Sequence, residues 1–237
     1  MMTRFISLIF LPLLAGCGST GTAPQKASDD FNAGEIIKSD IDRFAEAHQR
    51  EVFAELKVLM EKLYRRNPRE WKKSGQESME AAVARVFNIN VSHGWTFAEL
   101  ENKRGVEAIH LAFHEDFSGD RVLAFIAGLG GMVQTSFNDK TEFFLLDDLD
   151  PQALFNAARN VEIAVWKLSN ATAPDGALYL ISNETAGPVK NLSFEREFGK
   201  IIGGLDLLSK VIADKTNRTV AKVFQSLAGA IFLPVRF

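Results

Sequence analysis

The sequence contains almost no cysteine: Cys17 is the only one among its 237 residues. A lone cysteine cannot form an internal disulfide, and it cannot supply a zinc site made of several thiolates. The chain also lacks a strong excess of charge, because its formal net charge is only −3 at pH 7. Such a balance gives no reason to expect a nucleic acid as partner. We therefore expect neither disulfide chemistry in the folded part nor nucleic-acid binding.

Strong catalytic motifs are missing as well. The serines do not form the Gly-x-Ser-x-Gly turn of hydrolases. The run Gly128-x-Gly-Gly does not follow a strand pattern, which argues against a dinucleotide-binding loop. Whether the protein is an enzyme stays open at this point, and a non-enzymatic role is favoured.

The N-terminus has the pattern of a secretory signal. Arg4 supplies the positive charge, 5–14 form a short apolar run, and Ala15 and Gly16 are the small residues before a cleavage site. The apolar run is too short to cross a bilayer as a helix. We therefore expect residues 1–16 to be a signal peptide.

The residues Leu14-Ala15-Gly16-Cys17 are similar to the lipobox of bacterial lipoproteins. The resemblance implies cleavage before Cys17, a diacylglycerol thioether on its sulfur and an acyl chain such as palmitate on its amine. Several acyl chains give a stable membrane anchor, and no other cofactor is expected. Because position 18 is Gly rather than Asp, the resemblance favours the inner leaflet of the outer membrane, facing the periplasm. The alternative is an ordinary secretory signal followed by a chance cysteine.

Residues 17–29 are small and polar, and we expect them to form the lipidated cysteine and a flexible tether. Residues 30–237 then form one all-helical periplasmic domain. Apolar residues recur every three or four positions from about 30 to 66, and Asn67-Pro68 ends this first helix. Further helices are predicted over about 75–87, 105–116, 122–137, 151–168, 193–214 and 217–232. A capping box at Ser74 begins the helix over 75–87, and a second one at Thr96 precedes a turn of helix. Ser118-Gly119-Asp120 caps the helix over 122–137, Asp150-Pro151 begins the helix over 151–168, and a short strand is predicted over 178–181.

The stretch 122–137, VLAFIAGLGGMVQTSF, is apolar on nearly every side. A helix of this kind is usually buried. Gly128, Gly130 and Gly131 each cost about 1 kcal/mol in a helix interior relative to Ala, so close approach of neighbouring helices should compensate. We predict an irregular single-domain bundle of about seven helices around this central helix.

Two histidines, His110 and His114, are four residues apart on a predicted helix, and Glu107 precedes His110 by three. These side chains would share one face of the helix. With a carboxylate from elsewhere they could hold a metal ion, as in half of the Glu-x-x-His motif of ferritin-like bundles. The alternative is an exposed polar face with two ordinary histidines.

Two other groups of polar residues could bind ligands. Asn138, Asp139, Lys140 and Glu142 follow the central helix, and with Arg159 or Lys167 they could line a small polar pocket. Arg65, Arg66 and Arg69, with Lys72 and Lys73, form a basic cluster beside Tyr64 and Trp71 that would attract anions such as lipid headgroups or cell-wall groups. In each case ordinary solvation and helix capping are the alternative.

The mature part also resembles a group of uncharacterised proteobacterial lipoproteins. The resemblance is carried by Tyr64-Arg-Arg-Asn-Pro-Arg-Glu-Trp71, Asn138-Asp-Lys-Thr-Glu-Phe-Phe144 and Asn191-Leu-Ser-Phe-Glu-Arg-Glu-Phe198. It implies no activity. We therefore expect a membrane-anchored envelope lipoprotein that binds or scaffolds an envelope protein, a lipid or the cell wall. A metal-dependent enzyme using His110 and His114 and a lipid-handling helical module are the alternatives.

Overall fold

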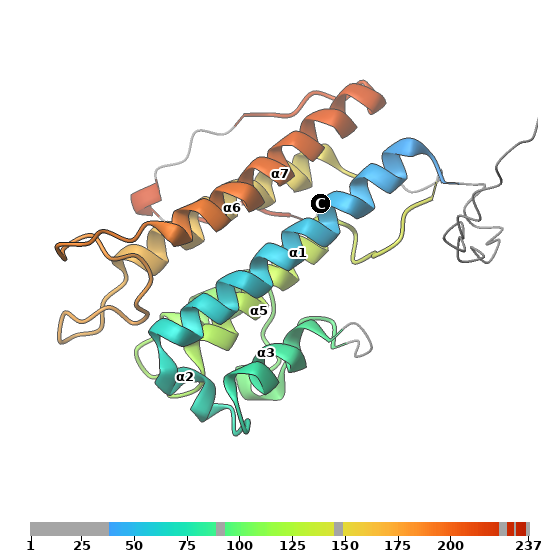
Figure 1. Cartoon of the computed structure of the whole chain (residues 1–237). Helices are drawn as coiled ribbons and strands as arrows, with labels where there is room; N and C mark the ends of the chain where they lie inside the picture. Colours follow the sequence, from blue (N-terminus) through green and yellow to red (C-terminus); the bar gives the residue numbers. More distant parts are fainter. Residues whose placement is uncertain (1–37, 89–92, 145–148, 223–226, 230, 236–237) are drawn as a thin grey trace, which may run out of the picture.

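The computed structural model describes residues 38–88, 93–144, 149–222, 227–229 and 231–235. Within these ranges the chain forms seven α-helices, two short 3-10 helices and no strand, which confirms the predicted all-α fold (Figure 1). The expected signal peptide, Cys17, the tether and the first part of the predicted helix over 30–66 lie outside the described residues.

Helix α1 (Asp40–Arg66) is the longest element. Ser39 caps its start: the Ser39 hydroxyl accepts from the Asp42 amide, and the Ser39 amide donates to the Asp42 carboxylate. Twenty-seven residues at about 1.5 Å each make α1 about 40 Å long. It ends before Asn67-Pro68 as predicted, but Pro68 at once begins a short helix that we did not predict, α2 (Pro68–Lys73).

The two predicted capping boxes at Ser74 and Thr96 are wrong. Ser74 ends α2 and donates its hydroxyl to the Trp71 carbonyl, and Ser78 caps α3 (Met79–Phe87) instead. The Thr96 hydroxyl donates to the His93 carbonyl, and only the 3-10 turn η2 (Ala98–Leu100) follows. The hydroxyls are used by local turns, and this competes with capping.

Helix α4 (Val106–Ala112) is shorter than predicted. The Arg121 guanidinium donates to the carbonyls of Ala112 and His114, both at 2.8 Å, so a side chain satisfies the carbonyl groups at the end of α4. His114 therefore lies in the turn that follows the helix rather than on its face.

Helix α5 (Arg121–Ser136) is buried along almost its whole length, and Asp120 caps it as predicted. A Cβ atom added to Gly128 would lie 2.7 Å from the backbone nitrogen of Ile109 and 2.8 Å from the Gly105 carbonyl oxygen. A Cβ at Gly130 would overlap the ring of Trp95. The glycines thus let α4 and the preceding loop approach the backbone of α5, which offsets their low helix propensity.

The last two long helices are α6 (Pro151–Asn170), capped by Asp150, and α7 (Ser193–Thr216). The predicted strand over 178–181 is wrong: in the described ranges the connection 171–192 contains only isolated bridges, Thr172 with Leu178 and Glu184 with Asn191. The predicted last helix is wrong as well for the residues that the structure describes: 218–222 and 231–235 are not helical, and 227–229 form the 3-10 turn η3 (Leu227–Gly229).

The C-terminal segment 231–235 lies instead against α6. The Asn160 side chain accepts from the Leu233 amide and donates to the Leu233 carbonyl at 2.6 and 2.7 Å, and Asn156 donates to the Pro234 carbonyl. These side chains of α6 satisfy the backbone groups of a segment that is itself neither helix nor strand.

The long helices lie side by side in the bundle (Figure 1). α6 packs on α7, α1 contacts both α7 and α5, and α4 covers α5. Between α1 and α7, Lys62 pairs with Glu197 at 3.3 Å, and Lys200 pairs with Glu55 at 2.8 Å. Of the helices that the structure describes, none combines the length and apolarity needed to cross a membrane.

Candidate functional site

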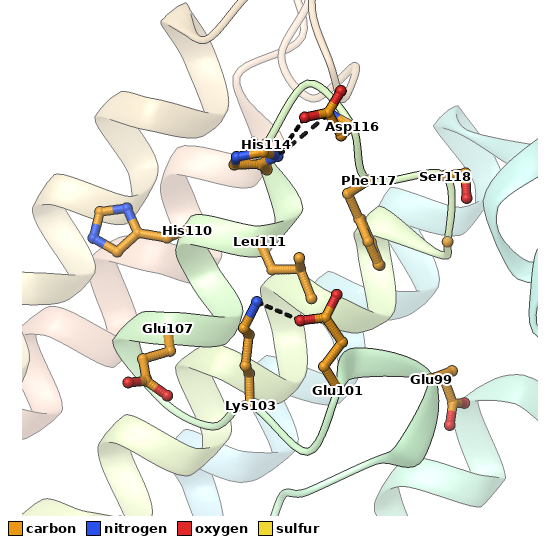
Figure 2. A pocket seen from close by; sticks show the side chains of 11 residues that line it. Glu99, Glu101, Lys103, Glu107, His110, Leu111, His114, Asp116, Phe117 and Ser118 are labelled. Atoms are coloured by element: carbon orange, nitrogen blue, oxygen red, sulfur yellow. Dashed lines mark hydrogen bonds and ion pairs between the residues drawn. The ribbon is translucent and has the colours of Figure 1, made fainter.

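A surface depression of about 680 Å³ lies beside α4, between residues 99 and 119. It is the part of the described surface where the predicted metal ligands Glu107, His110 and His114 lie (Figure 2). Three further carboxylates, Glu99, Glu101 and Asp116, also line it. The depression is therefore acidic, and it is where the predicted metal site can be compared with the structure.

The side chains in the depression do not form a metal site. Because α4 ends at Ala112, His110 and His114 point in different directions, and Glu107 lies apart from both (Figure 2). His114 instead faces Asp116, whose carboxylate is 3.8 Å from the His114 Nδ1 atom. Over the ranges that the structure describes, no three His, Cys, Asp or Glu side chains come together to hold a metal ion. The predicted common face of the two histidines is therefore wrong.

His110 is held by apolar contact rather than by ligands. Its ring meets the ring of Phe232 edge-on, with 5.3 Å between the ring centroids. Burial, followed by the positive charge of Lys167, lowers the pKa of His110. A neutral His110 thus joins the C-terminal segment to α4. Lys167, which we had considered as a partner of the loop after α5, lies near His110 instead.

Two of the four carboxylates in the depression already have cationic partners. Glu101 pairs with Lys103 at 2.6 Å, and Glu99 pairs with Arg85 of α3. The Asp116 side chain is 89 % exposed, so water screens its charge. The arrangement suits weak binding of a positively charged group. The Glu99 pair joins η2 to α3, and the Glu101 pair lies within one loop.

The strongest polar network lies beneath this surface and joins α1, α2 and α5. The Tyr64 hydroxyl donates to Asp120 at 2.8 Å, and the Arg121 amide donates to Glu70 at 2.8 Å. Burial raises the pKa of Asp120 to about 6, and burial together with the Asp120 charge raises the pKa of Tyr64. Tyr64 adjoins the basic cluster in sequence, but its side chain is buried and does not contribute to that surface.

The basic residues of the predicted cluster lie around the junction of α1 and α2. Arg65 is 66 % exposed and 3.8 Å from Glu61, and Arg69 is also exposed. Arg66 reaches across to Glu184 in the connection between α6 and α7, at 3.5 Å. Lys72 lies over the ring of Trp71, and Lys73 pairs with Glu70. The cluster thus survives as a surface, with Arg65 and Arg69 as its most open members.

Polar groups of the loop after α5 are engaged in contacts with other parts of the domain. Asn138 and Asp139 have positive φ angles of 57° and 61°, and Asp139 pairs with Arg104. The Lys140 carbonyl accepts from the Gln49 and Gln134 side chains, both at 2.7 Å. Glu142 is exposed. These contacts close the turn that ends α5.

Arg159 belongs to a different part of the fold. It pairs with Asp206 of α7 at 2.6 Å and with Glu162 at 3.1 Å. The described contacts therefore tie Arg159 to α7 instead of joining it to Asn138, Asp139, Lys140 and Glu142. The predicted polar pocket is not assembled by them.

A lipid cavity around α5 receives no support from the packing. The neighbours of Gly128, Gly130 and Gly131 lie close enough that even a methyl group would meet them. In the last predicted helix, the residues that the structure describes contain only the 3-10 turn η3. The depression beside α4 exceeds the volume of about 300 Å³ that a ligand pocket needs, but it is open to the surface and is not a cavity around α5.

Comparison with known proteins adds no relative. No protein-family model matches the chain, and no curated protein or solved structure matches it significantly.

Proposed function

We propose that this protein is a lipid-anchored component of a bacterial cell envelope, and that its helical domain binds or scaffolds another envelope component. The observation that carries the proposal is Leu14-Ala15-Gly16-Cys17 directly after a charged and then apolar N-terminus. In this proposal residues 1–16 are removed, Cys17 carries the diacylglycerol and an acyl chain, and the domain faces the periplasm. Gly18 favours the inner leaflet of the outer membrane.

The arrangement of the domain supports a binding role over catalysis. Several polar groups that the sequence marked as candidates are engaged in structural contacts: Asp139 with Arg104, Arg159 with Asp206, and Arg66 with Glu184. A catalytic acid or base needs to face a substrate within hydrogen-bond distance. The groups that remain open, such as Arg65 and Arg69, are surface charges that suit attraction of a partner.

The anchor is tested by expressing the full chain in bacteria fed with labelled palmitate. We expect the label in the wild-type protein, and a mature mass that corresponds to cleavage before Cys17 plus the lipid. The Cys17→Ser variant should carry no label and should keep residues 1–16. Equal labelling of the two proteins, or cleavage of the wild type without lipid, would overturn the proposal.

The binding role is tested by native mass spectrometry of the lipidated chain in detergent. We expect a protein without stoichiometric metal, and the same result for the His114→Ala variant. Bound zinc or iron that disappears in His114→Ala would favour a metal-dependent enzyme instead. Turnover of a lipid or cell-wall substrate by the purified chain would likewise contradict a non-enzymatic role.

A further inference from the structure

One end of the bundle exposes aliphatic side chains that the fold does not cover. Val189 is 78 % exposed, Leu192 is 53 % exposed and Ile181 is 44 % exposed. All three lie in the connection between α6 and α7. Figure 1 shows this connection at the end of the bundle opposite to the start of α1. Exposed aliphatic residues that gather in one place are a mark of interaction surfaces.

Hydrogen bonds hold this connection in shape. Glu184 and Asn191 exchange two backbone hydrogen bonds of 2.9 and 2.8 Å, which close the loop that carries Val189. The Glu184 carboxylate also accepts from the Gly187 amide at 3.1 Å. At the base, the Asn67 side chain donates to the Ile181 carbonyl and accepts from its amide, both at 2.8 Å. Hydrogen bonds thus fix the conformation of the loop, and the loop keeps the aliphatic side chains exposed.

Exposed cationic side chains lie in the same connection and at the adjoining helix junction. Lys190 follows Val189 and is exposed, and Arg65 and Arg69 are exposed at the adjoining junction of α1 and α2. The pair of Arg66 with Glu184 and the bonds of Asn67 with Ile181 place this junction against the connection. Two nearby carboxylates are engaged: Glu184 contacts Arg66, and Glu195 accepts from Asn183 at 2.7 Å. We call Ile181, Val189, Lys190, Leu192, Arg65 and Arg69 the distal tip.

We propose that the distal tip docks onto an anionic lipid surface. Burial of aliphatic side chains at the boundary between headgroups and acyl chains lowers the free energy. The neighbouring Lys and Arg side chains are attracted to anionic headgroups. A lipid surface offers both kinds of contact at once. A cell-wall polymer offers anions without an apolar layer, so it would leave Val189 and Leu192 without a partner.

This inference rests on the proposed function, in which Cys17 holds the other end of the molecule in a membrane. Helix α1 is about 40 Å long and separates the start of the domain from the distal tip. In this inference the distal tip contacts a second lipid surface, away from the one that holds the anchor, and the protein bridges the two.

The test uses the full lipidated chain inserted into phosphatidylcholine vesicles that are immobilised on beads. Fluorescent vesicles are then added, made either of phosphatidylcholine alone or of phosphatidylcholine with phosphatidylglycerol. We expect capture of the anionic vesicles only. Replacing Arg65, Arg69 and Lys190 by Gln should weaken capture by about fivefold for each cation. Val189→Ser should weaken it by about tenfold, because an aliphatic side chain no longer enters the lipid.

Matched variants on other exposed positions serve as controls. Lys57→Gln in α1, Lys210→Gln in α7 and Leu207→Ser in α7 remove the same kinds of side chain away from the distal tip. These variants should capture anionic vesicles as well as the wild type does. Circular dichroism of every variant verifies that the helical fold is intact.

Three outcomes would overturn the inference. The first is equal capture of anionic and neutral vesicles by the anchored chain, and the second is capture by the distal-tip variants as strong as that by the controls. Binding of isolated cell-wall sacculi without capture of vesicles would also overturn it, in favour of a cell-wall partner. The protein retained on the beads is measured first: a chain that is lost from them, or a Cys17→Ser variant retained equally, contradicts the proposed function instead.

Discussion

Asp120 is a carboxyl group that the fold keeps away from water: it is 2 % exposed. Its two oxygens have separate tasks, since Oδ1 accepts from the Leu123 amide at the start of α5 and Oδ2 accepts from the Tyr64 hydroxyl. Burial disfavours the charged form and raises the pKa of Asp120 to about 6. Asp120 therefore caps α5, but its ionisation in the folded state costs free energy.

This cost predicts a specific pH dependence for the Asp120→Asn variant. The pKa in the folded state lies above the value of about 3.9 in unfolded chains. The stabilisation from Asp120 is therefore complete below about pH 4 and is lost as the pH rises through about 6. Asn caps helices as well as Asp does and does not ionise. The free energy of unfolding of the variant, relative to wild type, should rise by about 2–3 kcal/mol between pH 4 and pH 7.

Urea unfolding of both proteins across this pH range measures the difference. If the two curves stay parallel from pH 4 to pH 7, ionisation of Asp120 does not cost the folded state free energy.

A Tyr64→Phe variant removes the hydroxyl that donates to Asp120. It should lower the stability of the wild-type background most at high pH, where the carboxylate is charged and needs that donor.

Gly128 and Gly199 are both helical glycines, and they should respond in opposite ways to Ala. At Gly128 the added methyl group would meet backbone atoms of Ile109 and Gly105 at 2.7 and 2.8 Å, which cannot rotate away. We expect Gly128→Ala to lower the free energy of unfolding by about 1–3 kcal/mol. Gly199 in α7 has no neighbour within 4 Å, so Gly199→Ala should raise it by about 0.5–1 kcal/mol. Denaturant titration measures both, and equal effects would contradict the close approach of α4 to α5.

At the scale of elements, the C-terminal segment depends on the amide side chains of α6. Asn160 is fully buried, and both of its polar atoms bond to the backbone of Leu233. We expect Asn160→Ala to release 231–235 and to lower the free energy of unfolding by about 1–3 kcal/mol, because the backbone groups of Leu233 lose their partners. Hydrogen exchange at the Leu233 amide should become fast.

The same variant should act on His110 at a distance. The ring of Phe232 covers His110, and burial is the first cause that lowers the pKa of this histidine. Release of the segment should bring the pKa of His110 back towards its usual value, which NMR titration can follow. Asn170→Ala is the matched control, because Asn170 is an exposed amide of the same helix that bonds only within it. A release caused by both variants would mean that α6 itself had been loosened.

The elements that the sequence predicted well are those set by local chemistry. Asp150-Pro151 begins α6, Asp120 caps α5 and Asn67-Pro68 ends α1, and each depends on neighbours in the chain. The capping boxes at Ser74 and Thr96 failed because local turns use both hydroxyls. Two other errors came from distant partners. Arg121 takes the carbonyls at the end of α4, which removes His114 from the helix, and Asn160 binds the C-terminal segment in an extended form.

The candidate site was harder to predict for the same reason. Tyr64 and Asp120 are 56 positions apart, and no pattern in the sequence relates them. Arg159 faces α7 because Asp206 lies on that helix at the matching height, 47 positions away. The distal tip carries a partial signal, since Val189-Lys190 and Arg65 stand out as apolar and basic residues, but their proximity depends on how α1 meets the connection 181–192.

At the scale of the whole molecule, one hydrophobic core joins the helices. Residues of α1, α3, α4, α5, α6 and α7 belong to the same buried cluster. We therefore expect the described domain to unfold in one cooperative transition. The three tryptophans report on different places, since Trp71 lies in α2, Trp95 lies against α5 and Trp166 lies in α6.

Tryptophan fluorescence and far-ultraviolet circular dichroism should thus give the same unfolding midpoint. Separate variants that keep a single tryptophan each would show whether all parts melt together. An earlier transition at Trp95 would indicate that α3 and α4 form a unit of their own.

Helix α1 also decides how the molecule would carry a mechanical load. A pull between the N-terminal side of Asp40 and the connection 181–192 runs along the axis of α1. The pairs of Lys62 with Glu197 and of Lys200 with Glu55 join α1 to α7 across that axis. If the two helices slid past each other, both ion pairs would be stretched at the same time and would not break one after another. The domain is thus built to resist tension along its length better than tension across it.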